Sequence, residues 1–392
     1  MKWLPMLAMA VCVPSFVVAA EFPVSNPAEL VIALKRARPA DSLVMADGTW
    51  KDAEIVFAAN GVAGKPVTLR AKTPGKVVLT GQSRLRIGGS HLVVDGLCFK
   101  DGCIKSGSVI EFRRDSKTFA SQCRLTNCAI TDYNPAERGL DYKWCSLYGQ
   151  SNRVDHCYFA GKTHLGTTLV VWVGDQPDCH RIDHNHFGPR PPLGENGGET
   201  VRVGTSEVSM NVSRTIVEDN LFERCNGEAE IVSNKSCENI YRRNTFLECA
   251  GALTLRQGKR CEVSGNVFIG NGKKNTGGVR VICEDHRVVG NRFYDLTGKD
   301  ARAALCLMNG IPDSPLHGYF QVKRALITSN TVVRCAQDIL IGYAGKGATL
   351  PPVDCVITNN VITAELGLKA PDTAAVKDVG PAWRKMELPD RR

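Results

Sequence analysis

The part of the sequence richest in groups that could do chemistry is Asn226-Gly227-Glu228-Ala229-Glu230-Ile231-Val232-Ser233-Asn234-Lys235-Ser236. Glu228 and Glu230 are two residues apart, so in an extended strand their carboxylates project from the same face. Adjacent carboxylates repel each other unless a cation lies between them, and hard oxygen ligands of this kind favour Ca²⁺. The pair is therefore either a calcium site or two solvated surface acids, and the spacing alone leaves both readings open.

Basic residues follow the acidic pair at similar intervals. Arg256 comes 21 residues after Lys235, and Arg280 comes a further 24 residues on. If the chain repeats with this period, Lys235 and Arg256 should lie one rung apart, about 4.8 Å along the axis of the repeat. A column of cations beside paired acids suits a bound polyanion. The alternative is a basic stripe that is simply solvated.

A repeated phrase predicts the elements that must position these residues. It reads any residue, Asn, any residue and then an apolar residue, usually Phe. Its close copies are His184-Asn185-His186-Phe187, Asp219-Asn220-Leu221-Phe222, Arg243-Asn244-Thr245-Phe246, Gly265-Asn266-Val267-Phe268 and Gly290-Asn291-Arg292-Phe293. Weaker copies are Thr126-Asn127-Cys128-Ala129, Ser329-Asn330-Thr331-Val332 and Asn359-Asn360-Val361-Ile362, and Asp155-His156-Cys157-Tyr158 fits with His in the place of Asn. The tight spacings are 24, 22 and 25 residues, and gaps of 35 and 39 leave room for loops on one face.

Between these phrases lie short β-rich runs, such as Ile231-Val232, separated by Gly, Asn and Asp. A period in the low twenties with about three short strands per turn is typical of a parallel β-helix. We therefore predict an all-β fold, a single-stranded right-handed parallel β-helix. Asn suits a turn because it tolerates a left-handed φ, and stacked side-chain amides can bond along the axis. The Phe two residues later is expected to stack inside.

The open ends of a solenoid must be covered. Asn26 is a suitable N-cap for a helix with Pro27 at its first position, and we expect residues 27–36 to form a short capping helix. The apolar face of this helix is expected to contain Leu30, Ile32, Ala33 and Leu34. After about Ala364 the periodicity ends. We predict one β-helix domain over residues 21–370 and a C-terminal tail, 371–392, that packs loosely along the surface.

The composition is that of an ordinary globular protein: 392 residues, 43% hydrophobic, 23% charged, with a formal net charge of +9. It excludes a wholly disordered, collagen-like or multi-span membrane protein. Lys2, an apolar run, and Val18-Ala19-Ala20 before Glu21 have the order of a secretory signal. We predict cleavage after Ala20, a periplasmic or secreted protein, and no membrane span, because the run is short of the ~20 residues that a span needs.

The sequence contains 16 cysteines, but their spacing does not favour a disulfide framework. Cys12 leaves with the predicted signal, so an odd number remains. Four of them recur at intervals of 24, 22 and 23 residues, and a second pair is 24 apart: Cys237, Cys261, Cys283 and Cys306, then Cys225 and Cys249. We expect these residues to stack from coil to coil as small buried hydrophobes. A disulfide between Cys98 and either Cys128 or Cys123 is left open.

Several phrases resemble family 6 polysaccharide lyases, the group that contains alginate lyases and chondroitinase B. They are Gly227-Glu228-Ala229-Glu230 with Ser233-Asn234-Lys235-Ser236, Leu255-Arg256-Gln257-Gly258, Gly278-Val279-Arg280, Asn196-Gly197-Gly198-Glu199-Thr200-Val201-Arg202-Val203-Gly204 and, less specifically, Gly81-Gln82-Ser83 with Gly96-Leu97-Cys98-Phe99. The likeness extends from about Gly48 to Asn360 and is strongest between Asn196 and Arg280.

This resemblance implies a role for each matching residue. It makes Glu228, Glu230 and Asn196 the ligands of a Ca²⁺ cofactor. It makes Lys235 the Brønsted base and Arg256 the acid of the reaction.

The resemblance also implies residues that bind the substrate. Arg280 matches a substrate-binding arginine, and Gln257 stands where many relatives have His. Tyr343 is a weaker candidate for a ring that stacks on a sugar, the alternative being a packed core Tyr. The implied function is β-elimination on an acidic, uronate-containing polysaccharide, most often alginate in this family, with dermatan sulfate as the alternative.

Two other classes remain open from the residues alone. A glycoside hydrolase would need carboxylates flanking the scissile bond, for which Asp219, Glu284 and Asp285 are available. A non-catalytic glycan-binding β-helix would keep the cationic face without needing the acids. Nucleic acid is not expected as a partner, because the basic residues are scattered and no nucleic-acid-binding motif occurs.

Overall fold

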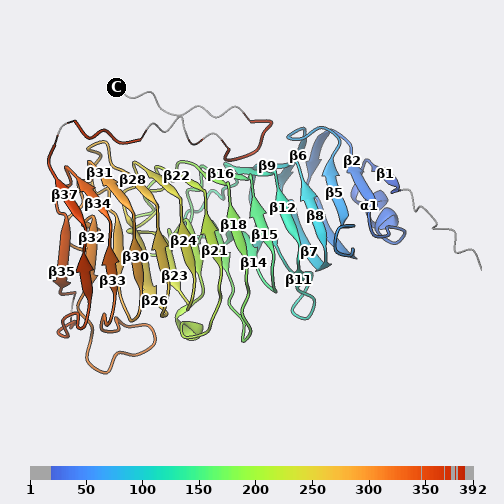
Figure 1. The fold of residues 1–392 in the computed structure, drawn as a ribbon. Coiled ribbons are helices and arrows are strands. Elements are labelled where there is room, and N and C mark those ends of the chain that lie inside the picture. The colour runs from blue at the N-terminus through green and yellow to red at the C-terminus, as the bar shows by residue number, and fades with distance from the viewer. Residues whose placement is uncertain (1–18, 346, 366, 372–375, 377, 385–392) are drawn as a thin grey trace, which may run out of the picture.

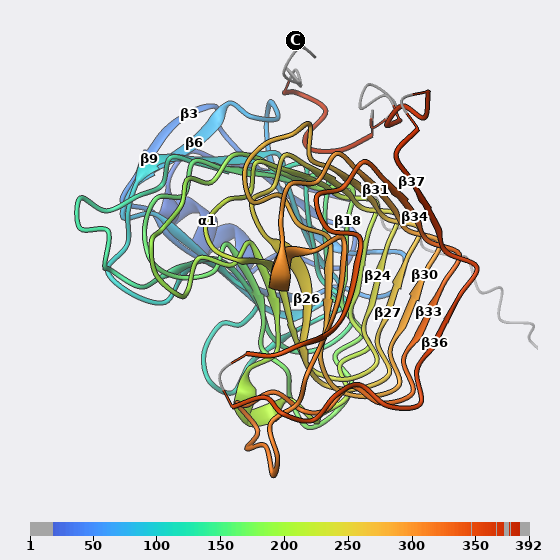
Figure 2. The same cartoon turned by 90° about the vertical axis from the view of Figure 1, so that its left-hand side faces the viewer.

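The computed structural model describes residues 19–345, 347–365, 367–371, 376 and 378–384. The chain winds into an elongated solenoid, and each regular coil contributes one strand to each of three parallel sheets (Figure 1). Seen nearly along its axis, the solenoid has these sheets as its sides (Figure 2). The predicted parallel β-helix is therefore confirmed.

The strands of sheet A lie on one side of the coil. They are β1 (Glu21–Val24), β2 (Ser42–Met45), β5 (Val67–Ala71), β8 (Leu92–Asp95), β12 (Arg124–Thr126), β15 (Arg153–Asp155), β18 (Arg181–Asp183), β21 (Ile216–Glu218), β24 (Ile240–Arg242), β27 (Glu262–Ser264), β30 (Arg287–Val289), β33 (Leu326–Thr328) and β36 (Val356–Thr358).

Sheet B follows sheet A across a short turn. Its strands are β3 (Gly48–Lys51), β6 (Val77–Gly81), β9 (Leu97–Gly102), β13 (Ala129–Thr131), β16 (Tyr158–Ala160), β19 (His186–Phe187), β22 (Leu221–Glu223), β25 (Thr245–Leu247), β28 (Val267–Ile269), β31 (Arg292–Tyr294), β34 (Thr331–Val333) and β37 (Val361–Thr363).

Sheet C completes the coil and carries the residues singled out above. Its strands are β4 (Glu54–Asn60), β7 (Arg84–Ser90), β10 (Ser108–Glu111), β11 (Ala120–Ser121), β14 (Lys143–Leu147), β17 (Leu169–Val171), β20 (Val201–Val203), β23 (Glu230–Lys235), β26 (Ala252–Gln257), β29 (Val279–Val281), β32 (Leu305–Met308) and β35 (Ile339–Tyr343). Two short 3₁₀ turns, η1 (Ser206–Val208) and η2 (Asp300–Arg302), lie in the loops of the described chain.

The turn from sheet A to sheet B contains a ladder of Asn side chains, all of them buried except the last, which is half-buried. Up to Asn330, each Asn Nδ2 donates to the Oδ1 of the Asn one coil further on, over distances of 2.9–3.0 Å; the ladder contains Asn185, Asn220, Asn244, Asn266, Asn291, Asn330 and Asn360. The predicted amide ladder is therefore confirmed. The left-handed residue, however, is the one before each Asn, for example Asp219 with φ 54° and Arg243 with φ 54°.

Two of the weaker copies of the phrase are off by one residue. The pairing of β12, β15 and β18 places Asn127 and His156 level with His184, in the left-handed position, where φ is 55° and 49°. Cys128 and Cys157 therefore occupy the ladder position in these coils. A small buried thiol fills the space that the amide fills elsewhere, which a search for Asn does not detect.

The expected stack of aromatic rings fills the interior beside this ladder. The rings of Phe159, Phe187, Phe222, Phe246, Phe268 and Phe293 lie nearly parallel, with successive centroids 4.5–5.5 Å apart. Because one coil rises by about one strand spacing, each ring contacts the next across the whole stack.

The first end of the solenoid is covered by α1 (Pro27–Leu34), which begins at the predicted cap. The Asn26 side chain accepts a hydrogen bond from the Glu29 N–H at 2.9 Å, and Glu29 accepts one in return from the Ser25 N–H at 2.7 Å. Leu30 and Ala33 are buried, whereas Ile32 is 60% exposed. The predicted apolar face was therefore too wide, because a single helix can turn only one side toward the end of the coil.

The described part of the C-terminal tail is docked, which differs from the loose packing expected. The tail runs back over sheet B (Figure 1). Gly380 N–H donates to the His184 carbonyl at 2.9 Å, and Trp383 Nε1 donates to the Asn127 carbonyl at 2.8 Å. The Trp383 ring also packs against Gly75, at a distance that leaves no room for a side chain there.

The cysteines of the described chain, which include Cys98, Cys123 and Cys128, are all free thiols. Cys225 and Cys249 stack as expected, with the Cys225 N–H 3.4 Å from the Cys249 sulfur. The longer series is wrong: Cys261 lies level with Asn239 and His286, and Cys306 lies level with Arg280. Because the coils differ in length, cysteines at nearly equal intervals in the sequence do not occupy the same position in each coil.

The predicted signal, residues 1–20, falls almost entirely outside the described residues. Within the described chain, no helix has the length and apolar character needed to cross a bilayer.

The Asn ladder yields a stability prediction. In Asn266→Ala the buried N–H of Asn244 loses its acceptor, and both Asn291 and the Tyr241 carbonyl lose a donor. The free energy of unfolding should fall by about 2–4 kcal/mol, measured by urea titration. Gln176→Ala, at an exposed amide side chain in the loop after β17, serves as the control and should change it by less than about 0.5 kcal/mol. An equal loss of unfolding free energy in both variants would contradict the claim that the hydrogen bonds of the Asn ladder stabilise the fold.

Candidate active site

The residues predicted to do chemistry gather on the outer face of sheet C. Along β23, β26 and β29 the side chains alternate, so that Val232, Leu253 and Val279 are buried in the core and lie level with one another. Their neighbours Ser233, Thr254 and Arg280 consequently form an outward row.

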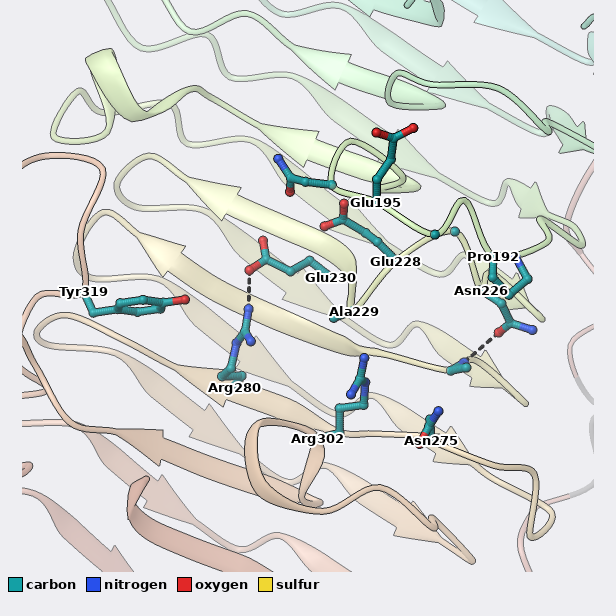
Figure 3. A pocket seen from close by; sticks show the side chains of 14 residues that line it. Pro192, Glu195, Asn226, Glu228, Ala229, Glu230, Asn275, Arg280, Arg302 and Tyr319 are labelled. Carbon is teal, nitrogen blue, oxygen red and sulfur yellow. Dashed lines mark hydrogen bonds and ion pairs between the residues drawn. The ribbon is translucent and has the colours of Figure 1, made fainter. Parts of the chain in front are cut away.

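A pocket of about 460 Å³ opens where the chain passes from sheet B to sheet C. Glu228 lies in the turn before β23 and Glu230 is the first residue of that strand, and both side chains point into the pocket (Figure 3). Asn196, from the loop between β19 and β20, also lines it. The three predicted calcium ligands therefore border one space.

The surroundings of the Glu228 carboxyl group disfavour its ionised form. Burial and the neighbouring carboxylate of Glu199 raise its pKa to about 7, Glu230 adds to this, and hydrogen bonds from the N–H groups of Gly198 and Gly197 oppose it. Those N–H groups donate to Oε2 at 2.9 Å and 2.7 Å. A cation in the pocket would relieve this repulsion.

Glu230 is the centre of the local ion pairs. It pairs directly with the guanidinium of Arg280 (Figure 3), and Ser233 Oγ donates to its other oxygen at 2.6 Å. Arg256 Nε lies 3.8 Å from the oxygen that faces Arg280. Arg256 and Arg280 therefore both lie beside Glu230, one of the two glutamates singled out in the sequence.

Lys235 and Arg256 lie on adjacent rungs, as predicted, but with a local irregularity. The register shifts between Asn234 and Lys235, so that Lys235 is level with Gln257 and not with Arg256. Lys235 and Arg256 are both half-buried. None of the four residues Glu228, Glu230, Lys235 and Arg256 is sealed in the hydrophobic interior.

A loop after β32 covers the far side of this row. Arg256 donates to the carbonyls of Gly318 and His317 at 2.7 Å and 2.9 Å, and its guanidinium carbon lies 4.1 Å from the ring centroid of Tyr319. Gln257 donates to the carbonyl of Leu316 and is fully buried. The predicted substrate-binding role of Gln257 does not fit this placement, because the loop shields its side chain.

The stacking role predicted for Tyr343 stays a prediction, but the structure shows where the tyrosines of this region lie. Tyr343 packs beside Met308 and does not line the pocket, whereas Tyr319 does. Tyr319 comes from the 39-residue gap between Asn291 and Asn330, where the repeat is interrupted. That interruption was the available signal, since loops inserted into a regular scaffold often carry functional residues.

Other residues of the lining were not predicted either. They are Pro192, Gly194, Glu195, Asn226, Gly227, Ala229, Ala250, Asn275 and Arg302. Most belong to the loops and turns that precede strands of sheet C, outside the repeated phrase.

The donor set of the pocket fits a hard cation. Carboxylate and amide oxygens are what Ca²⁺ takes, usually with six to eight oxygen ligands. Among the described residues, no three acidic, His or Cys side chains converge on a shared metal position. An ion held by Glu228 and Glu230 would therefore draw its remaining ligands from amide oxygen, water and substrate.

The carboxylates that a hydrolase would need are engaged elsewhere. Asp219 pairs with Arg243 at 2.7 Å, and both Glu284 and Asp285 pair with Arg324, at 2.6 Å and 2.7 Å. These pairs lie beside the ends of strands of sheet A, and none of their residues lines the pocket. They disfavour a pair of carboxylates poised across a glycosidic bond.

Comparison with known proteins shows the family of the chain. The family model described as chondroitinase B matches residues 24–368. No curated protein sequence matches the chain. The family 6 alginate lyase AlyGC is 43% identical over 88% of this chain and 50% of its own, with a TM-score of 0.84. The chain therefore spans about half the length of that relative.

Two further solved structures match along most of both chains. A mannuronic acid-specific family 6 lyase from the human gut microbiota is 32% identical, covers 93% of this chain and 97% of its own, and has a TM-score of 0.83. The family 6 polysaccharide lyase Pedsa3628 from Pseudopedobacter saltans is 29% identical over 92% and 90%, with a TM-score of 0.79. The class defined by fold and site is thus a β-helix that resembles polysaccharide lyases, and the chain belongs to the chondroitinase B family.

The raised pKa of Glu228 predicts how stability depends on pH in the absence of metal. The folded state favours the protonated acid, so its stabilising contribution is full below about pH 4.5 and is lost as the pH rises through about 7. Between pH 5 and 8 in chelator, the wild type should lose about 2 kcal/mol more unfolding free energy than Glu228→Gln. Denaturant titration at both pH values measures this difference, and parallel curves would contradict the assigned environment.

Proposed function

We propose that this protein is a secreted polysaccharide lyase that cleaves alginate by calcium-assisted β-elimination. The observation that carries the proposal is the meeting of Glu228, Glu230 and Arg280 at one pocket, with Arg256 3.8 Å from Glu230 and Lys235 on the strand next to that of Arg256. The proposed address rests on the signal-like residues 1–20.

The chemistry needs a cation at the uronate carboxylate and a base at C5. Arg280 would bind the substrate carboxylate, since a guanidinium can donate two parallel hydrogen bonds to it. Glu228 and Glu230 would hold Ca²⁺, which when bound stabilises negative charge on that carboxylate.

Lys235 accepts the C5 proton on Nζ, for which its amine must be neutral. The electrons of the C5–H bond form the C4–C5 double bond while the C4–O bond breaks. Arg256 keeps its positive charge beside the departing oxygen, and water supplies the proton that this oxygen takes up. The stacking of Arg256 on Tyr319 and its bonds to the Gly318 and His317 carbonyls hold the guanidinium in place.

Alginate is favoured over dermatan sulfate by the names of the matching structures. AlyGC is described as an alginate lyase, and the gut protein as mannuronic acid-specific. Dermatan sulfate is the second candidate because the family model is named for chondroitinase B.

Turnover should depend on both proposed catalytic residues. Purified protein incubated with alginate should produce unsaturated uronate ends that absorb in the ultraviolet. Lys235→Ala and Arg256→Ala should lower the rate at least 10³-fold, on the scale of losing a general base, with unchanged far-ultraviolet circular dichroism. Lys259→Ala, at a lysine one coil on that pairs with Glu284 at 3.2 Å, is the matched control.

The same assay separates the alternatives. Absorbing products from dermatan sulfate alone would reassign the substrate. Reducing ends without absorbance would indicate a hydrolase, and binding without products would indicate a glycan-binding protein. Near-wild-type rates in Lys235→Ala would remove the assigned base.

Removal of divalent ions tests the cofactor. Excess chelator should abolish activity, and added Ca²⁺ should restore it, because two carboxylates without a cation repel the substrate carboxylate. Glu230→Gln should require a higher Ca²⁺ concentration for half-maximal rate. Full activity in chelator would rule out a metal role for this pair.

A further inference from the structure

Arg190 lies directly behind the pocket and is almost completely buried, with 3% of its surface exposed. Its guanidinium is held mainly by main-chain carbonyls. Nη1 donates to the Glu199 carbonyl at 2.8 Å and to Thr168 Oγ1 at 3.2 Å, and Nη2 donates to the Gly166 and His164 carbonyls at 3.0 Å and 3.2 Å. One side chain therefore joins the loops that lead into two neighbouring strands of sheet C, β17 and β20.

The main chain of Arg190 is tied to a third coil, the one that carries the acidic pair. Its N–H donates to the Arg224 carbonyl at 3.1 Å, and its carbonyl accepts from the Asn226 N–H at 2.9 Å. Gly227 lies against the Arg190 side chain, where an added Cβ would come 2.8 Å from Nε and 2.1 Å from the Gly198 carbonyl oxygen. The turn that ends at Glu228 thus rests on Arg190.

The hydrogen bonds of Glu228 and Arg190 connect the same two segments of the chain. Its Oε2 accepts the N–H groups of Gly197 and Gly198, and the next residue, Glu199, gives its carbonyl to Arg190. Movement of Arg190 would separate the loop at 196–199 from the turn at 224–228. The carboxylate of Glu228 would then lose the two donors that orient it.

Arg190 also supplies positive charge behind the acids. Burial lowers the pKa of Arg190 to about 10, and the carboxylates of Glu199 and Glu228 act in the opposite direction, so it stays cationic at neutral pH. Burial lowers the pKa of nearby Lys162 well below its ordinary value, which favours the neutral amine there.

We propose that Arg190 is a positioning residue for the Glu228 site: it aligns the 196–199 loop with the turn carrying Glu228, so that the carboxylate faces the pocket in one orientation. It does not reach the pocket and is not a catalytic residue. The part of the proposal that concerns calcium rests on the function proposed above, whereas the alignment of the loop does not.

Hydrogen exchange in chelator tests the alignment without metal or substrate. In Arg190→Met the amides of Gly197 and Gly198 should exchange at least tenfold faster than in the wild type, followed by mass spectrometry on peptides that contain them. Arg153→Met is the matched control, since it removes an arginine that pairs with buried Asp183 at 2.6 Å on sheet A. It should leave exchange at 197–198 unchanged. Wild-type exchange in folded Arg190→Met would overturn the proposal.

Arg190→Lys keeps the charge but not the planar fork that contacts several carbonyls, and it carries the test if the Met variant does not fold. It should show faster exchange at the same amides and a Ca²⁺ requirement for half-maximal rate raised at least fivefold, with kcat at saturating Ca²⁺ within about twofold. A change in melting temperature alone, with both readouts at wild-type values, would overturn the positioning role. Absence of lyase activity in the wild type would instead refute the function and leave the exchange result to decide the alignment.

Discussion

The site depends on the parallel register between coils. Glu230, Arg256 and Arg280 are far apart in the sequence, yet each lies on a different strand of sheet C, and strands in register bring them into contact. The register is held from inside by the Asn ladder and the ring stack, in which each side chain touches its equivalent one coil away. A slip of one residue would turn the charged row into the core, and the buried amides would lose their partners.

The two glutamates of the pocket differ in how far their negative charges are compensated by neighbouring cations. Glu230 is compensated by two guanidinium groups, whereas burial and the neighbouring Glu199 carboxylate raise the pKa of Glu228. Arg190 compensates from behind, and Arg256 is kept in place by carbonyls and by the Tyr319 ring. Such an arrangement favours a divalent ion and a carboxylated sugar in the same pocket. The ion would offset the charge of the protein carboxylates, and the sugar carboxylate would offset the charge of the guanidinium groups.

Much of the fold could be predicted from the sequence because each coil repeats the same local requirement. A left-handed residue, an inward Asn and an inward Phe recur at the same turn, and the acidic and basic residues of the site belong to coils where the repeat is regular. Prediction failed where the repeat was replaced or interrupted. Cys128 and Cys157 substitute for Asn, and the loop that carries Tyr319 and covers Gln257 lies in the 39-residue gap where the repeat is interrupted. Arg190 was missed because its partners are mainly main-chain carbonyls, which leave no pattern in residue types.

The most direct test is an experimental structure of Lys235→Ala with Ca²⁺ and an alginate tetrasaccharide. The account predicts an ion bound by Glu228 and Glu230, a uronate carboxylate between that ion and Arg280, and the adjoining C5 within about 4 Å of the space left by the Lys235 amine. An oligosaccharide bound on another face of the solenoid, or an ion bound away from both glutamates, would contradict it.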